Sequence, residues 1–271
     1  HTWLPDAHTE ASTPVSVLLA GVLLKLGTYG LLRFCMGLFP DAWQLASPWL
    51  AFWAAISVLY GSLAAIAQTD MKRMVAYSSV GHMGYVLLAA AAATPLGLMG
   101  ALFQMVSHAL ISGVLFLMVG VVYVRTGTRD LNVLRGLLNP QRGLPLTGTL
   151  MIVGVMASAG LPGMAGFISE FLIFRGTLQP FPLATLLSMV GSGLTAVYFL
   201  LLVNRAFFGR LAIATGAVVN PRILDRVALR EQVPAIALSL GVLVLGLAPG
   251  LLSNLSEAAT TGLSLINGDL S

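Results

Sequence analysis

Long apolar segments separated by short polar connections constrain this chain more than any other feature. They occupy residues 14–33, 46–68, 74–93, 96–124, 144–178, 183–204 and 233–252. A transmembrane helix needs about 20 mainly apolar residues to cross the hydrocarbon core. Only 9% of the 271 residues are charged, whereas soluble domains carry about 25%. The pattern predicts an all-α, polytopic membrane protein. It excludes a disordered chain, a nucleic-acid-binding arm and an ordinary cytosolic enzyme.

One apolar segment, residues 144–178, is too long for a single straight crossing. As a continuous helix it would run about 52 Å at 1.5 Å per residue, against a hydrocarbon core of about 30 Å. Two full crossings would each be short. The sequence Gly160–Gly163 reads GLPG, which breaks a helix. We therefore expect one crossing made of a broken helix, and about seven crossings in total.

The basic residues favour the same topology. With residues 144–178 as one crossing, 11 of the 14 Lys and Arg residues lie on one side of the bilayer, only Arg33 and Arg175 lie on the other, and Lys25 lies inside a crossing. The positive-inside rule makes the 11-residue side cytoplasmic. Residues 1–13 are then a cytoplasmic polar segment, residues 14–252 form the transmembrane bundle, and residues 253–271 form a C-terminal tail.

Several classes of chemistry lack their usual signatures. The single cysteine, Cys35, excludes a disulfide framework and a cysteine-based metal or iron–sulfur site. The sequence contains no signal peptide, Walker loop, dinucleotide fingerprint or nucleophile elbow. Because the chain begins with His1 inside a polar segment, we expect it to be the C-terminal part of a longer polypeptide. Ion movement without redox chemistry in this chain is the class that remains.

Two charged residues lie deep inside apolar segments, away from the segment ends, where each costs about 2.5–3.5 kcal/mol by insertion scales. Lys25 is near the middle of the first segment, and Glu170 follows Pro162 by eight residues in the second half of the broken one. Burial disfavours the charged form of both groups, so each can exchange a proton near neutral pH. The alternatives are a structural lysine paired with a carboxylate and a glutamate at a loop edge.

Two histidines, His82 and His108, lie inside consecutive apolar segments. Imidazole both accepts and donates a proton near neutral pH. A lone intramembrane histidine often forms only a hydrogen bond between helices, and no ligand spacing here suggests a metal site. Together with Lys25 and Glu170, the histidines predict a proton relay. Polar neighbours that can hold water are Ser78, Ser79, Gln104, Ser107 and Ser112.

Two further polar groups lie at segment ends. The sequence Asp70–Arg73 favours an interfacial anchor and topology signal, with a water-accessible point of proton uptake as the alternative. We expect the polar N-terminal residues to lie at the membrane interface: His1, Asp6, His8 and Glu10. The alternative interpretation is that they line the opening of a proton path.

Several motifs resemble one protein family. They are HTWLPDAH at 1–8, GVLLK at 21–25, YGLLR at 29–33, AQTDMKRMVAYSSVGHMG at 67–84, SH at 107–108 and LPGMAGFISEF at 161–171. Together they resemble the NuoM/NdhD antiporter-like subunit of respiratory complex I and of its photosynthetic relative, over about residues 1–210. Residues 9–16 and 193–198 resemble the NdhD variants of the cyanobacterial carbon dioxide-uptake complex.

The resemblance implies the second half of an inverted-repeat antiporter-like fold in the membrane arm of a thylakoid complex. In that family the lysine matching Lys25 is the central relay lysine, and the glutamate matching Glu170 ends the half-channel to the far side. His82 and His108 match histidines along the central polar axis. The family's upstream Glu–Lys pair would precede His1.

The implied function is proton translocation within an NAD(P)H or ferredoxin:plastoquinone oxidoreductase. The resemblance implies that this chain binds no cofactor and that plastoquinone and the iron–sulfur clusters are bound elsewhere in the complex. Its partners would be the other membrane-arm subunits, the bilayer and, in the carbon dioxide-uptake form, a carbon dioxide-hydrating subunit. The alternative is a stand-alone Na⁺/H⁺ antiporter subunit, which would bind Na⁺ without redox partners.

Overall fold

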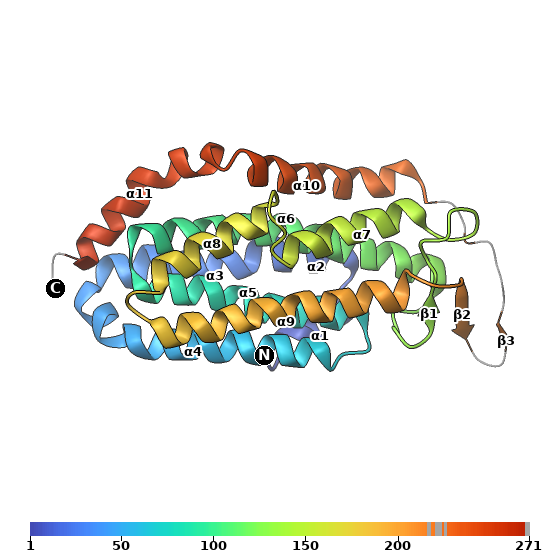
Figure 1. The fold of residues 1–271 in the computed structure, drawn as a ribbon, viewed down its shortest axis with the longest axis horizontal. Coiled ribbons are helices and arrows are strands. Elements are labelled where there is room, and N and C mark those ends of the chain that lie inside the picture. The colour runs from blue at the N-terminus through green and yellow to red at the C-terminus, as the bar shows by residue number, and fades with distance from the viewer. Residues whose placement is uncertain (216–217, 220–223, 225–226, 269–271) are drawn as a thin grey trace.

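The computed structural model describes residues 1–271 except 216–217, 220–223, 225–226 and 269–271. Its helices lie side by side in an elongated bundle, with the short strands gathered at one end (Figure 1). The helical elements are α1 (Leu4–Glu10), α2 (Thr13–Leu18), η1 (Leu19–Leu23), α3 (Leu24–Gly30), η2 (Leu31–Met36), α4 (Pro40–Ile66), α5 (Met71–Ala92), α6 (Pro95–Thr126), α7 (Pro145–Ser158), α8 (Ala165–Thr177), α9 (Pro182–Ala206), α10 (Leu229–Leu247) and α11 (Gly250–Gly268). The strands are β1 (Leu134–Arg135), β2 (Ala212–Thr215) and β3 (Val218–Val219).

Within the described chain, 6 helices are long and apolar enough to cross a membrane. They are the run Thr13–Met36, which joins α2, η1, α3 and η2, and the helices α4, α5, α6, α9 and α10. Outward side chains of α4 such as Leu45 and Trp49 are 82% and 69% exposed, and such apolar surface is typical of contact with lipid. The predicted polytopic all-α membrane fold is confirmed.

The predicted helix break is present between α7 and α8. The two half-helices lie end to end in Figure 1, joined by a short loop. In that loop Gly160 and Gly163 adopt φ values of +75° and +90°, which glycine reaches without a steric penalty from a Cβ atom. Pro162 between them lacks the N–H that a continuing helix needs.

Helix α10 packs directly against this break. Gly246 of α10 lies so close to the Gly163 carbonyl oxygen and to the backbone of Met164 that any Cβ atom there would overlap both. A small residue is therefore required for the two backbones to approach, as at many helix contacts inside membranes.

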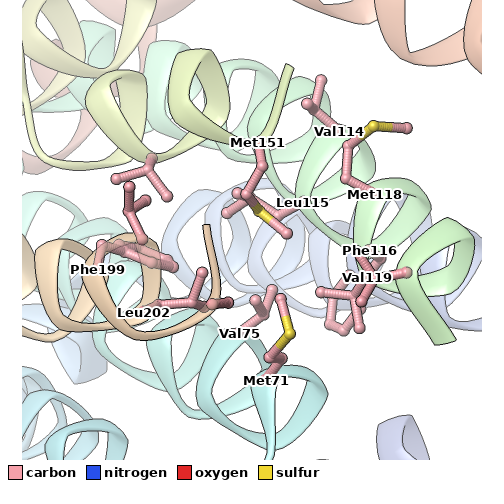
Figure 2. Close-up of a cluster of buried hydrophobic side chains, with 14 of the residues drawn as sticks. Met71, Val75, Val114, Leu115, Phe116, Met118, Val119, Met151, Phe199 and Leu202 are labelled. Atoms are coloured by element: carbon pink, nitrogen blue, oxygen red, sulfur yellow. The ribbon is translucent and has the colours of Figure 1, made fainter. Parts of the chain in front are cut away.

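Helices α5 and α6 form the centre of the bundle. In the most apolar 18-residue stretch of each of these two helices 78% of the residues are buried, compared with at most 39% in the corresponding stretches of the other spans. Figure 2 shows part of this core, a cluster of buried hydrophobic side chains that includes Met71 and Val75 of α5, Leu115 of α6, Met151 of α7 and Phe199 of α9. The relay residues predicted on α5 and α6 are therefore held in the best-packed part of the molecule.

Polar caps explain where the central helices begin. The Asp70 carboxylate precedes α5 and accepts hydrogen bonds from the backbone N–H groups of Lys72 (2.7 Å) and Arg73 (3.1 Å). The Thr94 hydroxyl does the same for Gly97 in α6 (3.0 Å). Such caps satisfy N–H groups that have no partner within the helix.

Ion pairs and a small sheet connect the elements at the end of the bundle where most Lys and Arg residues lie, which we call the basic end. The pairs are Arg73–Asp6 (2.5 Å), Arg125–Glu231 (2.8 Å) and Arg129–Asp70 (3.2 Å). At the same end β1 pairs antiparallel with β2, and β2 with β3. The strands were not predicted. At the opposite end, residues 253–268 of the predicted C-terminal tail form most of α11.

Candidate proton-relay site

Lys25 reaches the interior from a helix with unusual geometry. It follows η1, a π-helical turn, and π-helical segments are frequent at functional sites. Its Nζ donates to the carbonyl oxygen of Ala20 within that turn and lies 2.5 Å from Nδ1 of His108. None of the ion pairs among the described residues includes Lys25, so a histidine takes the place of the carboxylate partner considered from the sequence.

His108 joins three elements. Its Nδ1 faces Lys25 of α3, and its Nε2 lies 3.1 Å from the Ser79 hydroxyl of α5. Its own carbonyl oxygen, on α6, accepts a hydrogen bond from Ser112 (2.6 Å). The side chain is buried, so both ring nitrogens are used for contacts inside the protein.

His82 is the second histidine of the interior, with its ring centroid 5.3 Å from that of His108. Nδ1 lies 3.0 Å from Nε2 of Gln104, and Nε2 lies 2.9 Å from the Ser158 hydroxyl. The side-chain amide oxygen of Gln104, Oε1, in turn accepts a hydrogen bond from the Ser169 hydroxyl (2.5 Å). With the amide nitrogen donating to Nδ1, the ring proton belongs on Nε2.

Glu170 lies on α8 beside the helix break. Its side chain is 5% exposed, and its Oε2 accepts a hydrogen bond from Ser192 of α9 (2.6 Å). A Cβ atom built on Gly160 would lie 3.2 Å from that oxygen. The loop between α7 and α8 therefore forms one wall of the carboxylate site. Glu170 is a buried residue next to this loop, and not an exposed residue at its edge.

A small interior cavity of ≈ 10 Å³ connects these groups. It is lined by His82, Gln104, Ser107, His108, Ile111, Ala157, Ser158, Gly166 and Glu170. That volume is close to the room that one water molecule needs, and the lining offers several polar partners. The structure thus brings together all four residues selected from the sequence: three line one cavity, and Lys25 contacts one of those three.

Three serines of this site, Ser158, Ser169 and Ser192, were not selected from the sequence. Each contacts a relay residue or its glutamine partner. Ser158 lies directly before the break and Ser169 directly before Glu170, so proximity to those features was the available signal. Ser192 lies on another helix, and nothing local distinguishes it from serines that serve helix packing.

The polar residues at the segment ends are placed differently. The Asp70–Arg73 cluster forms the cap of α5 and two ion pairs, as an interfacial anchor should. His1 packs edge-on against Tyr60. No group of three or more His, Cys, Asp or Glu residues in the described part of the chain is placed to hold a metal ion.

The chain is similar to known proteins in both sequence and structure. Residues 1–195 match the family described as NADH:quinone oxidoreductase/Mrp antiporter, TM. NAD(P)H-quinone oxidoreductase chain 4 1 of Synechococcus sp. (strain JA-3-3Ab) is 42% identical over 271 residues, which is 97% of this chain and 50% of that protein. The chain therefore spans about half the length of such relatives.

Solved structures agree with this result. A chain of respiratory complex I from Thermus thermophilus with bound NADH superposes with a TM-score of 0.89 at 30% identity, over 99% of this chain and 55% of that one. A chain of the Mrp complex from Dietzia sp. DQ12-45-1b shares the fold, with a TM-score of 0.86 at 24% identity over 99% of this chain and 56% of that one.

Proposed function

Since the chain belongs to the NADH:quinone oxidoreductase/Mrp antiporter family of membrane subunits, we propose that it forms part of a proton-translocating subunit of a redox-driven quinone oxidoreductase. The observation that carries the proposal is the contact of Lys25 with His108, which shares an interior polar cavity with His82 and Glu170. Ionisable groups inside a membrane are energetically costly and rare, and those that occur usually mark ion pathways or proton relays.

The contacts support one order of proton transfer. Lys25 exchanges a proton with Nδ1 of His108 across 2.5 Å. The cavity beside His108 has room for about one water molecule, and it is lined by His82 and Glu170 as well. A proton leaving His108 therefore has two acceptors within one water-bridged step. Glu170 is the terminal acceptor, and Ser192 steadies its ionised form by donating a hydrogen bond.

The energy of transfer comes from outside the relay. Moving one elementary charge through 100 mV costs about 2.3 kcal/mol, and a pKa change of one unit is worth about 1.4 kcal/mol. Changes of a few units, imposed on Lys25 and Glu170 by neighbouring charges, are enough to work against an ordinary membrane potential. This chain then requires no redox chemistry of its own, and quinone and iron–sulfur clusters belong to other subunits.

The finer proposal concerns the complex. We propose a thylakoid complex with plastoquinone as acceptor and NAD(P)H or ferredoxin as donor. The cyanobacterial relative named above, a chain of an NAD(P)H-quinone oxidoreductase, supports the coarser part of this proposal, NAD(P)H and a quinone. The similarity of residues 9–16 and 193–198 to variants of the carbon dioxide-uptake complex favours that form, with a carbon dioxide-hydrating subunit as a further partner. The side carrying the Lys and Arg residues is then the cytoplasmic one.

A stand-alone Na⁺/H⁺ antiporter subunit is the competing function. Sodium is bound by several oxygen ligands, and paired carboxylates are the usual source of negative charge in a buried cation site. In the described interior, Glu170 is the single carboxylate of the cavity, and its other lining groups include two imidazoles. The ligand set therefore favours protons over sodium.

The test is Lys25→Ala in the full-length subunit, assembled in its complex in sealed membrane vesicles. We expect proton translocation driven by quinone reduction to be lost while the subunit stays assembled. Arg33→Ala is the matched control, because it removes an exposed cation from the same span. Proton translocation at the normal rate in Lys25→Ala refutes the proposal, and Na⁺-dependent proton movement without an electron donor supports the antiporter instead.

A further inference from the structure

A pocket at the basic end of the bundle lies outside the relay described above. Its volume is ≈ 690 Å³, and it lies where the chain leaving α9 runs beside strand β1 (Figure 1). Three of its lining residues are arginines: Arg135, Arg205 and Arg210. The other lining residues are Leu131, Asn132, Asn204, Phe208, Gly209 and Ala212. Among the described residues, the lining therefore contains three cations and no carboxylate.

Two segments far apart in the sequence are fixed against each other to form this pocket. The backbone N–H groups of Gly136 and Leu137 donate to the carbonyl oxygens of Phe208 (3.0 Å) and Ala206 (3.1 Å). Gly136 has a φ of +68°, and a Cβ atom built on it would overlap the backbone of Arg210. The fold therefore brings arginines from both segments to one cavity through backbone contacts that a side chain at position 136 would prevent.

The three arginines have no acidic partner in the described part of the chain. None of the ion pairs found there includes Arg135, Arg205 or Arg210. The carboxylate of Asp130 is near in sequence, but it accepts a hydrogen bond from the N–H of Asn132 (2.9 Å) and does not line the pocket. A cleft lined by charges of one sign concentrates counter-ions. Guanidinium groups bind phosphate through two parallel hydrogen bonds, so a phosphate group suits this lining.

The position of the pocket along α9 places it at the level of lipid headgroups. Helix α9 has 25 residues and is about 37 Å long at 1.5 Å per residue, whereas the hydrocarbon core is about 30 Å thick. Its ends therefore reach into the headgroup layers, and its last turn carries Arg205. Basic pockets at the ends of membrane spans are suited to anionic headgroups.

An apolar surface leads along α9 from the hydrocarbon region to the pocket. Val190, Val197 and Leu200 lie on the outward face of the helix, each about half exposed. Asn204 follows Leu200 by four residues and so continues this face, and it lines the pocket together with the half-exposed Phe208. An acyl chain can lie on this face while its headgroup occupies the pocket. An acidic protein segment would match the charge of the pocket but not this apolar approach, so the surface favours a lipid.

We propose that this pocket binds the headgroup of an anionic phospholipid, with the phosphate among the three arginines and an acyl chain on the outward face of α9. The proposal does not depend on proton translocation, because it uses only the charge, shape and depth of the pocket. Its alternatives are an acidic segment of another protein and arginines that act only as a topology signal.

The test is photo-crosslinking of lipid to the full-length subunit assembled in its complex. The probe is phosphatidylglycerol with a diazirine on one acyl chain, in vesicles that otherwise contain phosphatidylcholine, and mass spectrometry locates the crosslinks. We expect crosslinks within residues 190–204, which excess phosphatidylglycerol removes and the same excess of phosphatidylcholine does not. Equal removal by the two lipids means ordinary boundary lipid and overturns the proposal. Removal by inorganic phosphate means a site for the free ion and overturns it as well.

A pair of variants tests the role of the arginines. Arg205→Gln combined with Arg210→Gln should lower the crosslinks on α9 by about tenfold or more, because each basic residue near an anionic membrane surface changes association about fivefold. The matched control is Arg142→Gln combined with Arg230→Gln, which removes the same charge from exposed arginines outside the pocket.

The crosslinks are divided by the amount of subunit in the complex, so poor assembly of a variant does not affect the comparison. Equal losses in the two double variants, or wild-type crosslinking in the pocket variant, refute the proposal. Wild-type crosslinking together with loss of a neighbouring protein from the pocket variant identifies the acidic protein segment as the occupant instead.

Discussion

Replacing Gly160 by Ala tests whether the helix break forms part of the carboxylate site. Gly160 has a φ of +75°, where an L-residue costs about 1–2 kcal/mol. The new methyl group would also lie 3.2 Å from Oε2 of Glu170. It would crowd the 2.6 Å hydrogen bond from Ser192 to the same oxygen, which is worth about 0.6 kcal/mol in membrane proteins and at most about 1.7. The total expected loss of stability is about 2–3 kcal/mol.

Gly163→Ala provides the matched control. Gly163 also has a positive φ, +90°, but an added Cβ atom there would meet only a side-chain atom of Leu247 at 4.0 Å. The two variants therefore share backbone strain and differ in their effect on Glu170. We expect both to lower the temperature at which the subunit is lost from the purified complex.

Proton translocation should distinguish the two variants. The assay records fluorescence quenching by a pH-sensitive dye in sealed vesicles, divided by the rate of quinone reduction measured in the same sample. We expect this ratio to fall by about threefold or more in Gly160→Ala, since a loss of about 1 kcal/mol at Glu170 changes an equilibrium about fivefold, and to stay near the wild-type value in Gly163→Ala. Equal ratios in the two variants would show that the break does not act on Glu170.

Two further predictions concern polar groups on either side of Lys25. Gln104→Met keeps the length of the side chain but removes the amide group that contacts His82 and Ser169. The subunit should therefore lose about 1–3 kcal/mol of stability. An unchanged temperature for release of the subunit from the complex would contradict this. His8 should make stability depend on pH, because burial, assisted by Lys72 and Lys25, lowers its pKa from the ordinary 6.5 to about 4 in the folded state. Unfolding therefore takes up a proton between these two values, and stability should fall as the pH drops from 6.5 towards 4. Thermal unfolding of wild type and His8→Phe across that range checks this, because the variant should lack the contribution.

The fold was largely predictable because the membrane restricts the chain to helices of known length. The apolar segments located the spans, and the composition of Gly160–Gly163 located the break. The strands were missed because β1 has only two residues and its partner β2 is far away in the sequence. The helical form of α11 was missed because its serines, threonines and glycines resemble a polar tail.

The candidate site was predictable where a residue type was out of place in an apolar segment. Lys25, His82, His108 and Glu170 were selected on that basis, and the structure groups them. The exact partners were not predictable. The contact of Lys25 with His108, rather than with a carboxylate, depends on the π-helical turn before Lys25, and a π-helical turn has no simple sequence signature. Ser192 reaches Glu170 only through the packing of α9 on α8.

The close approach of Gly246 to Gly163 has a consequence for efficiency. The interrupted helix exposes backbone polar groups at mid-membrane depth, and such groups are tolerated only when protein or water covers them. With α10 seated on the loop, lipid is kept from one side of it and stray water has no gap to occupy there. A bulkier residue at position 246 would push α10 away from the loop and uncover these backbone groups. If the chain translocates protons as proposed, water entering there would let protons return without doing work. The sealing of the broken helix therefore depends on the absence of a side chain at Gly246.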